Sequence, residues 1–184
     1  DINGDGIVDQ YDKVAIGYTA IPEINYGFGI SLGYKGFDAS VFFSGVAHVT
    51  RQIGGSNLYG GSDNPLYTSQ VFKDVALNHW TKENPNYNAP YPRLGTTLST
   101  NNNQTSDYWT RDMSFLRLKN AEIGYTFPKK WTKKAGIQAL RLYVMGTNLL
   151  TFSEFKLWDP ELDTAYGTRY PITRNVSVGL NINF

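Results

Sequence analysis

The chain has 184 residues, a formal net charge of +1 and no cysteine. The near-neutral charge gives no support to a nucleic-acid partner, and the lack of cysteine fits an exported protein without a disulfide framework. No stretch approaches the roughly 18 consecutive apolar residues of a membrane-spanning helix, which excludes a helical membrane protein. Aromatic residues make up 15% of the chain, as is typical of barrel strands with aromatic girdles.

The first twelve residues have the spacing of an EF-hand-type calcium loop. Oxygen-bearing side chains occupy loop positions 1, 3, 5, 9 and 12, position 7 offers its carbonyl, and Gly6 permits the sharp turn. The last ligand is Asp rather than Glu, as in dockerin-type extracellular loops. We expect a structural Ca²⁺ site, the alternative being an Asp/Asn/Gly-rich turn without an ion. The predicted metal ligands are Asp1, Asn3, Asp5, Ile7, Asp9 and Asp12.

Alternating apolar and polar residues predict a hairpin after this loop. One strand is expected over residues 24–34 and a second over 37–46, each with an apolar and a polar face. Lys35 and Gly36 form the tight turn between them, because glycine readily adopts a positive φ. Asp38 and Ser40 lie on the polar face.

Three further strands are predicted over residues 114–127, 137–150 and 176–184. In the first of them Leu116 and Leu118 fall out of phase with Ile123, so either a bulge intervenes or the leucines pack inward under a loop. Glu122 and Thr126 belong to its polar face. Residues 129–136 form a short basic turn.

The apolar stripe of the last predicted strand ends on Phe184. A strand of a soluble β-sandwich shows the same alternation, but the recurrence of such stripes beside glycine favours a membrane β-barrel with a polar lumen.

The connections between these strands alternate in length. Residues 35–36 and 128–136 are short, whereas residues 47–113 and 151–173 form long loops; outer-membrane barrels have short periplasmic turns and longer extracellular loops. Helical spacing of apolar residues predicts one short helix within residues 70–80. Five strands are too few to close a barrel, so we expect a fragment of a larger one, with residues 1–23 as an extracellular loop and 24–184 as barrel strands.

The residues indicate the function less clearly than they indicate the fold. Two histidines, no cysteine and no phosphate-cradling glycine loop give no support to an enzyme. Flat aromatic side chains in the expected loops can stack on sugar rings, although loop packing or a membrane girdle is the explanation that we favour for each of them. The candidate substrate contacts are Trp80, Tyr91, Trp109 and Trp158.

Several segments in order resemble one family, the SusC/RagA-type TonB-linked outer-membrane proteins. They include Asp1–Gly6, Tyr34–Asp38, Trp80–Pro85, Phe115–Asn120, Asn148–Phe152, Asp159–Glu161 and Tyr170–Pro171. The resemblance covers the whole chain and implies the last five antiparallel strands of a barrel of about 22 strands.

This resemblance also implies function and partners. The family imports glycans or peptides across the bacterial outer membrane, using energy delivered by TonB and a SusD-like surface lipoprotein as a lid. The expected partners are the remaining barrel and plug, that lipoprotein, TonB, the barrel-assembly machinery and outer-membrane lipid, including LPS. The resemblance also implies that Phe184 is the signal for the barrel-assembly machinery. The alternative is a secreted all-β carbohydrate-binding or adhesion module with a dockerin-like loop. A second copy of that calcium loop, which dockerins carry, is missing here.

Overall fold

The computed structural model describes residues 1–54, 71–95, 102, 104–167 and 169–184. Five long strands agree within two residues with those predicted. They are β1 (Ile24–Tyr34), β2 (Phe37–Ala47), β5 (Phe115–Thr126), β6 (Ala139–Phe152) and β7 (Asn175–Asn183). The shorter elements are η1 (Gln10–Asp12), β3 (Thr50–Gln52), α2 (Lys73–Asn78), η3 (Asp107–Trp109), β4 (Thr110–Asp112), α3 (Lys129–Thr132) and η4 (Lys133–Ala135). In these parts of the chain no helix is both long and apolar enough to cross a membrane.

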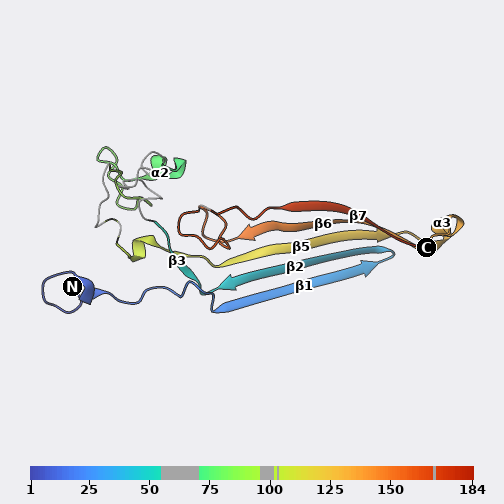
Figure 1. Cartoon of the computed structure of the whole chain (residues 1–184), viewed down its shortest axis with the longest axis horizontal. Helices are drawn as coiled ribbons and strands as arrows, with labels where there is room; N and C mark the ends of the chain where they lie inside the picture. Colours follow the sequence, from blue (N-terminus) through green and yellow to red (C-terminus); the bar gives the residue numbers. More distant parts are fainter. Residues whose placement is uncertain (55–70, 96–101, 103, 168) are drawn as a thin grey trace.

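The five long strands form one antiparallel sheet in the order β1-β2-β5-β6-β7. Each long strand pairs with the next long strand along the chain, and the short β3–β4 pair lies in the long connection between β2 and β5. Both long connections and the N-terminal loop lie at one end of the sheet, whereas the β1–β2 turn, α3 and the C-terminus lie at the other (Figure 1). We call these the loop end and the turn end.

The connections hold more regular structure than the sequence predicted. α2 confirms the short helix expected within residues 70–80. The same connection also contains the pair β3–β4 and the short helix η3, which were not predicted. The basic segment 129–136, expected as a turn, is folded into α3 and η4.

The β1–β2 turn and the irregularity in β5 follow from local backbone geometry. Lys35 and Gly36 have φ values of 48° and 90°, the positive angles that a two-residue type I′ hairpin turn requires. In β5 the bulge alternative is confirmed: Phe43 of β2 pairs with Leu118 and Phe42 with Asn120, so Lys119 has no partner in β2. The bulge brings Leu118 onto the same face as the apolar residues farther along β5.

The sheet has one apolar and one polar face, which we call the outer and inner faces. One row across all five strands shows the outer face, because its members pair successively. The row is Leu32, Ala39, Ile123, Val144 and Val178. In it Leu32 and Val178 are 65% and 71% exposed. Soluble proteins rarely expose an apolar surface of this extent, whereas a barrel strand presents one to lipid.

Glycines on the sheet make room for large side chains of neighbouring strands. Tyr143 of β6 lies over Gly179 of β7, and Phe42 of β2 lies over Gly27 of β1. Tyr26 crosses Gly45 and donates a hydrogen bond from its hydroxyl to the carbonyl oxygen of Phe115, at 2.9 Å. At these three positions the missing side chain of glycine therefore permits close packing along the sheet.

Candidate functional site

The buried core of the chain lies at the loop end, outside the main sheet. Its members come from both long connections and are Val49, Ile53, Val75, Tyr91, Trp109, Met113 and Phe155. Backbone hydrogen bonds join distant parts of the first connection: the N–H of Met113 donates to the oxygen of Val49, and that of Ile53 to Trp109, both at 2.9 Å. The N–H of Gly54 donates to the oxygen of Ala165 in the second connection, at 3.4 Å. The long connections therefore pack together as a folded unit at this end.

A cavity of about 560 Å³ opens beside this core, and we call it the loop cavity. Its aromatic walls are Trp80, Tyr87, Tyr91, Tyr108 and Trp109, and its polar lining includes Asn86, Arg93, Asn102, Gln104 and Ser106. Ring faces beside amide and guanidinium groups form a surface that can stack on a flat ligand and hydrogen-bond its edges.

The structure brings three of the four predicted substrate residues together. Trp80, Tyr91 and Trp109 line the loop cavity, whereas Trp158 packs edge-on against Phe155, with ring centroids 4.9 Å apart. Tyr91 and Trp109 are each only 2% exposed and belong to the core. The accessible aromatic surface therefore comes from half-buried Trp80, from Tyr108 and above all from Tyr87, which is 93% exposed. Neither tyrosine was among the predicted contacts.

Tyr91 also makes a buried polar contact that the sequence did not reveal. Its hydroxyl donates to Oδ2 of Asp74 in α2, at 2.7 Å. Burial, with a smaller contribution from Asp74, raises the pKa of Tyr91 well above its ordinary range. The protonated hydroxyl ties α2 to the wall of the loop cavity.

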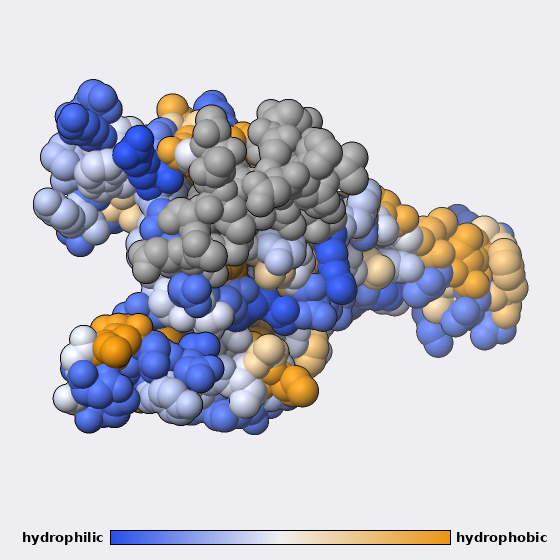
Figure 2. Space-filling model, turned by 60° about the vertical axis from the view of Figure 1, so that its left-hand side comes forward, coloured by the Kyte–Doolittle hydropathy of each residue, from blue (hydrophilic) through white to orange (hydrophobic). Residues whose placement is uncertain are grey.

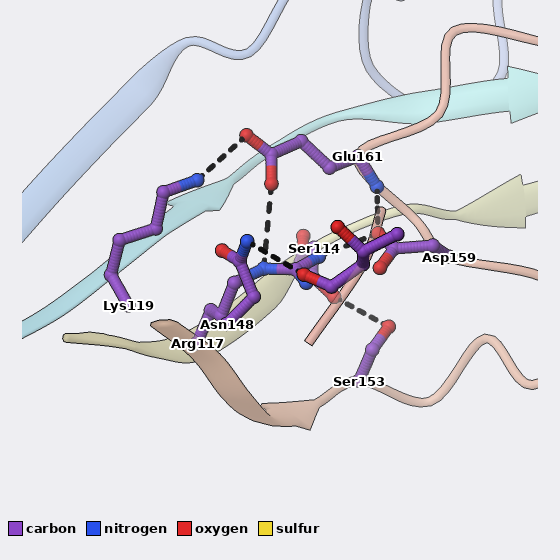
Figure 3. Close-up of polar contacts among 8 residues, drawn as sticks. Ser114, Arg117, Lys119, Asn148, Ser153, Asp159 and Glu161 are labelled. Carbon is purple, nitrogen blue, oxygen red and sulfur yellow. Dashed lines mark hydrogen bonds and ion pairs between the residues drawn. The ribbon is translucent and has the colours of Figure 1, made fainter. Parts of the chain in front are cut away.

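A second polar cluster joins the segment after β6 to the inner face of β5 (Figure 3). Arg117, whose side chain is 2% exposed, lies 2.5 Å from Oδ1 of Asp159 and 3.4 Å from Oε2 of Glu161. Lys119 reaches the other oxygen of Glu161 at 3.5 Å. Ser153 donates to the backbone oxygen of Ser114, at 2.8 Å. We call this the Arg117 latch.

The predicted inner-face residues Asp38, Ser40, Glu122 and Thr126 do share one face of the sheet, as the pairing register shows. Arg141 of β6, which was not among the predicted residues, contacts two of them. Its Nε donates to Oδ1 of Asp38 at 3.0 Å, and its Nη2 contacts the other Asp38 oxygen and Oε1 of Glu122, the latter at 2.5 Å. One guanidinium thus crosslinks β2, β5 and β6 on the polar face.

The N-terminal loop is closed by its own side chains. Asp1 accepts the backbone N–H groups of Gly4 and Gly6, and Asp12 accepts those of Ile2 and Asp9, at 2.7–2.8 Å. The donor set is chemically suited to calcium, which prefers carboxylate and carbonyl oxygens. No three His, Cys, Asp or Glu side chains converge on a metal position anywhere in the described ranges. The calcium site therefore stays a prediction.

The two histidines make contacts typical of structural residues. Nδ1 of His79 lies 3.1 Å from the carbonyl oxygen of Val75, at the end of α2. His48 stacks on Tyr18, with centroids 4.2 Å apart, and lies 3.3 Å from a carboxylate oxygen of Glu23. Phe184, the expected assembly signal, is exposed at the turn end. Its role stays a prediction.

Comparison with known proteins shows which proteins the chain is similar to. No protein-family model matches the chain. TonB-dependent receptor P3 of Formosa agariphila is 32% identical over 199 residues, and TonB-dependent receptor SusC of Bacteroides thetaiotaomicron is 29% identical over 187. Both matches cover 100% of this chain, but only 18% and 17% of the relatives. The chain thus spans about a fifth of the length of the curated relatives it matches.

Solved structures agree with the sequence relatives. The RagAB peptide importer in its open-open state matches 97% of this chain and 20% of its own, at 26% identity and a TM-score of 0.69. Its closed-closed state matches 98% of this chain and 20% of its own, at 25% identity and a TM-score of 0.70. The resemblance seen in the sequence is confirmed. By sequence along its whole length and by fold, the chain is a barrel segment of a SusC/RagA-type TonB-dependent receptor.

Proposed function

We propose that this chain forms part of the wall and outer surface of a bacterial outer-membrane transporter that imports glycans or peptides. The observation that carries the proposal is the sheet itself, apolar on the outer face and polar on the inner one, with its long connections folded at one end. The relatives named above are receptors and an importer, in keeping with a protein that is not an enzyme. In this arrangement residues 1–23 and 47–113 are extracellular.

The whole transporter requires partners beyond this chain. We infer that the rest of the barrel closes against β1 and β7, because each of these strands pairs on one side only among the residues described. A plug, a SusD-like surface lipoprotein and TonB would complete the import machinery, and the barrel-assembly machinery would insert it into the membrane.

The full-length protein in detergent provides the test of this function. We expect it to fractionate with outer membranes, to copurify with a surface lipoprotein, and to migrate differently on gels before and after boiling. A full-length protein that is soluble without detergent, and that migrates identically before and after boiling, would instead support the secreted adhesion module.

We further propose that the loop cavity contacts the cargo. Replacing Trp80 or Tyr87 with alanine removes a ring face and should weaken cargo binding by the full-length transporter with its partner roughly 2- to 12-fold, the equivalent of one aromatic contact. Isothermal titration with an oligosaccharide mixture and, separately, with a peptide mixture measures the loss and identifies the cargo class.

Tyr170→Ala is the matched control for these substitutions. Tyr170 is 82% exposed and does not line the loop cavity. Binding should be unchanged in this variant. Wild-type affinity in both the Trp80 and Tyr87 variants would remove the loop cavity from the import pathway.

Calcium, if bound, would be held by the N-terminal loop and would fix its shape. Asp1, Asn3, Asp5, Asp9 and Asp12 would supply side-chain oxygens, and Ile7 its carbonyl. Replacing Asp1 and Asp5 with alanine in the full-length protein should remove a calcium peak from anomalous scattering, while Glu83→Ala, another exposed acidic loop residue, should leave it. A peak that survives the double substitution would refute the assignment.

The same loop should respond to acid. Hydrogen bonds from the backbone N–H groups of Asp9 and Ile2 lower the pKa of Asp12 below its ordinary value of 3.8. A carboxyl with a lowered pKa in the folded state stabilises that state above its ordinary pKa and loses this effect as the pH falls through the lowered value. We therefore expect hydrogen-exchange protection of Ile2 and Asp9 to persist down to about pH 3.8 and to be lost below it.

A further inference from the structure

The turn end of the sheet carries a concentration of positive charge. Residues 128–136, which we call the lysine turn, contain Lys129, Lys130, Lys133 and Lys134 and no acidic residue. Lys35 in the β1–β2 turn lies close by, since the N–H of Thr126 donates to the oxygen of Gly36 at 2.7 Å. All five lysines are exposed, and none forms an ion pair within the described chain.

A string of aromatic rings leads from the outer face of the sheet to this charge. Phe37 pairs with Tyr125 on the outer face, with ring centroids 4.5 Å apart. Phe127 follows at 5.1 Å from Tyr125, and Trp131 at 6.3 Å from Phe127. Trp131 belongs to the lysine turn and is 62% exposed. Amphipathic rings of this kind concentrate where a membrane meets water.

The lysine turn also contains a hollow. It has a volume of about 310 Å³ and is lined by Lys129, Lys133, Gly136, Ile137 and Gln138. Ammonium groups and an amide thus border an apolar side chain. Figure 2 shows hydrophobic and hydrophilic surface side by side at the narrow right-hand end of the molecule. A ligand suited to this surface has an anionic head beside an apolar body.

We propose that the lysine turn binds the phosphate headgroup of an anionic phospholipid in the leaflet that borders the turn end. The lysines supply charge at headgroup level, and the aromatic string places Trp131 at the boundary of the acyl chains. A soluble anion would use the charge alone. It would leave the exposed ring of Trp131 and the outer-face aromatics without a role.

The test measures lipid retained by the full-length transporter. The protein is placed in nanodiscs of phosphatidylcholine with phosphatidylglycerol, released, and examined by native mass spectrometry. Replacing Lys129, Lys130, Lys133 and Lys134 with glutamine should reduce retained phosphatidylglycerol about tenfold or more. Replacing the same four with arginine should preserve it. Retention equal to wild type in the glutamine variant would overturn the proposal.

The matched control removes the same charge from the opposite end. Lys13, Lys73, Lys82 and Lys156 are exposed in the N-terminal loop and the long connections, and their replacement by glutamine should leave phosphatidylglycerol retention unchanged. An equal loss in this control would indicate a net-charge effect and overturn the site. Displacement of the lipid by soluble glycerol phosphate at matched concentration would also overturn it, because the headgroup alone would then suffice. If the variant with all four lysines of the lysine turn replaced does not migrate as a folded barrel, the double variant Lys129→Gln and Lys133→Gln is tested by the same criteria, because these two lysines line the hollow.

Discussion

Replacing Arg117 with methionine is expected to destabilise the full-length barrel by about 3–5 kcal/mol, the cost typical of breaking a buried ion pair from one side. Arg117 is buried on the inner face, and its closest partner Asp159 is only 17% exposed. Methionine fills much of the same volume but leaves the carboxylate of Asp159 without its cation. Glu161 would also lose its contact with Arg117, so the segment after β6 should separate from β5.

The measurement is urea unfolding of the full-length protein in lipid vesicles, combined with limited proteolysis of residues 153–167. Arg51→Met is the matched control, because Arg51 pairs with Asp163, whose side chain is 66% exposed. Solvated pairs contribute about 0–1 kcal/mol, so this variant should unfold nearly as wild type does. Equal effects of the two substitutions would show that the Arg117 latch does not hold the loop.

Most of the sheet could be predicted because its physical signal is local. Period-two alternation marks each strand, and the pair Lys35–Gly36 encodes its own turn. The bulge at Lys119 was also visible, since Leu118 and Ile123 fall on opposite phases of a regular strand. The sequence left two explanations open there, and only the pairing register of β5 with β2 decides between them.

The candidate sites were less predictable because they depend on contacts between distant residues. Arg117 and Asp159 are 42 positions apart, and Arg141 and Asp38 are 103 apart, so no spacing in the sequence marks either pair. Among the aromatic candidates, the sequence could not separate the accessible Trp80 from the buried Trp109. Loop residues carry no strict periodicity, and their burial is set by how two long connections pack together.

Replacing Gly45 with alanine is the second substitution with a large expected effect. Gly45 is buried in β2, where an added Cβ would meet the carbonyl oxygen of Phe115 and would lie 2.6 Å from the hydroxyl of Tyr26. A backbone oxygen of a paired strand cannot move aside as a side chain can. We expect a loss of about 1–3 kcal/mol from overpacking, plus about 1 kcal/mol if Tyr26 releases its hydrogen bond to Phe115.

Gly33→Ala provides a control in the same sheet. The nearest atom to a Cβ at Gly33 is the oxygen of Phe37, at 3.8 Å, and its backbone does not have a positive φ. That variant should unfold at the wild-type urea concentration or slightly above it, since alanine restricts the unfolded chain. Tyr26→Phe removes the same hydrogen bond that Gly45→Ala disturbs, so the double variant should lose less than the sum of the two single losses. Simple additivity would mean that Tyr26 keeps its bond over alanine and that steric pressure on β5 alone accounts for the destabilisation.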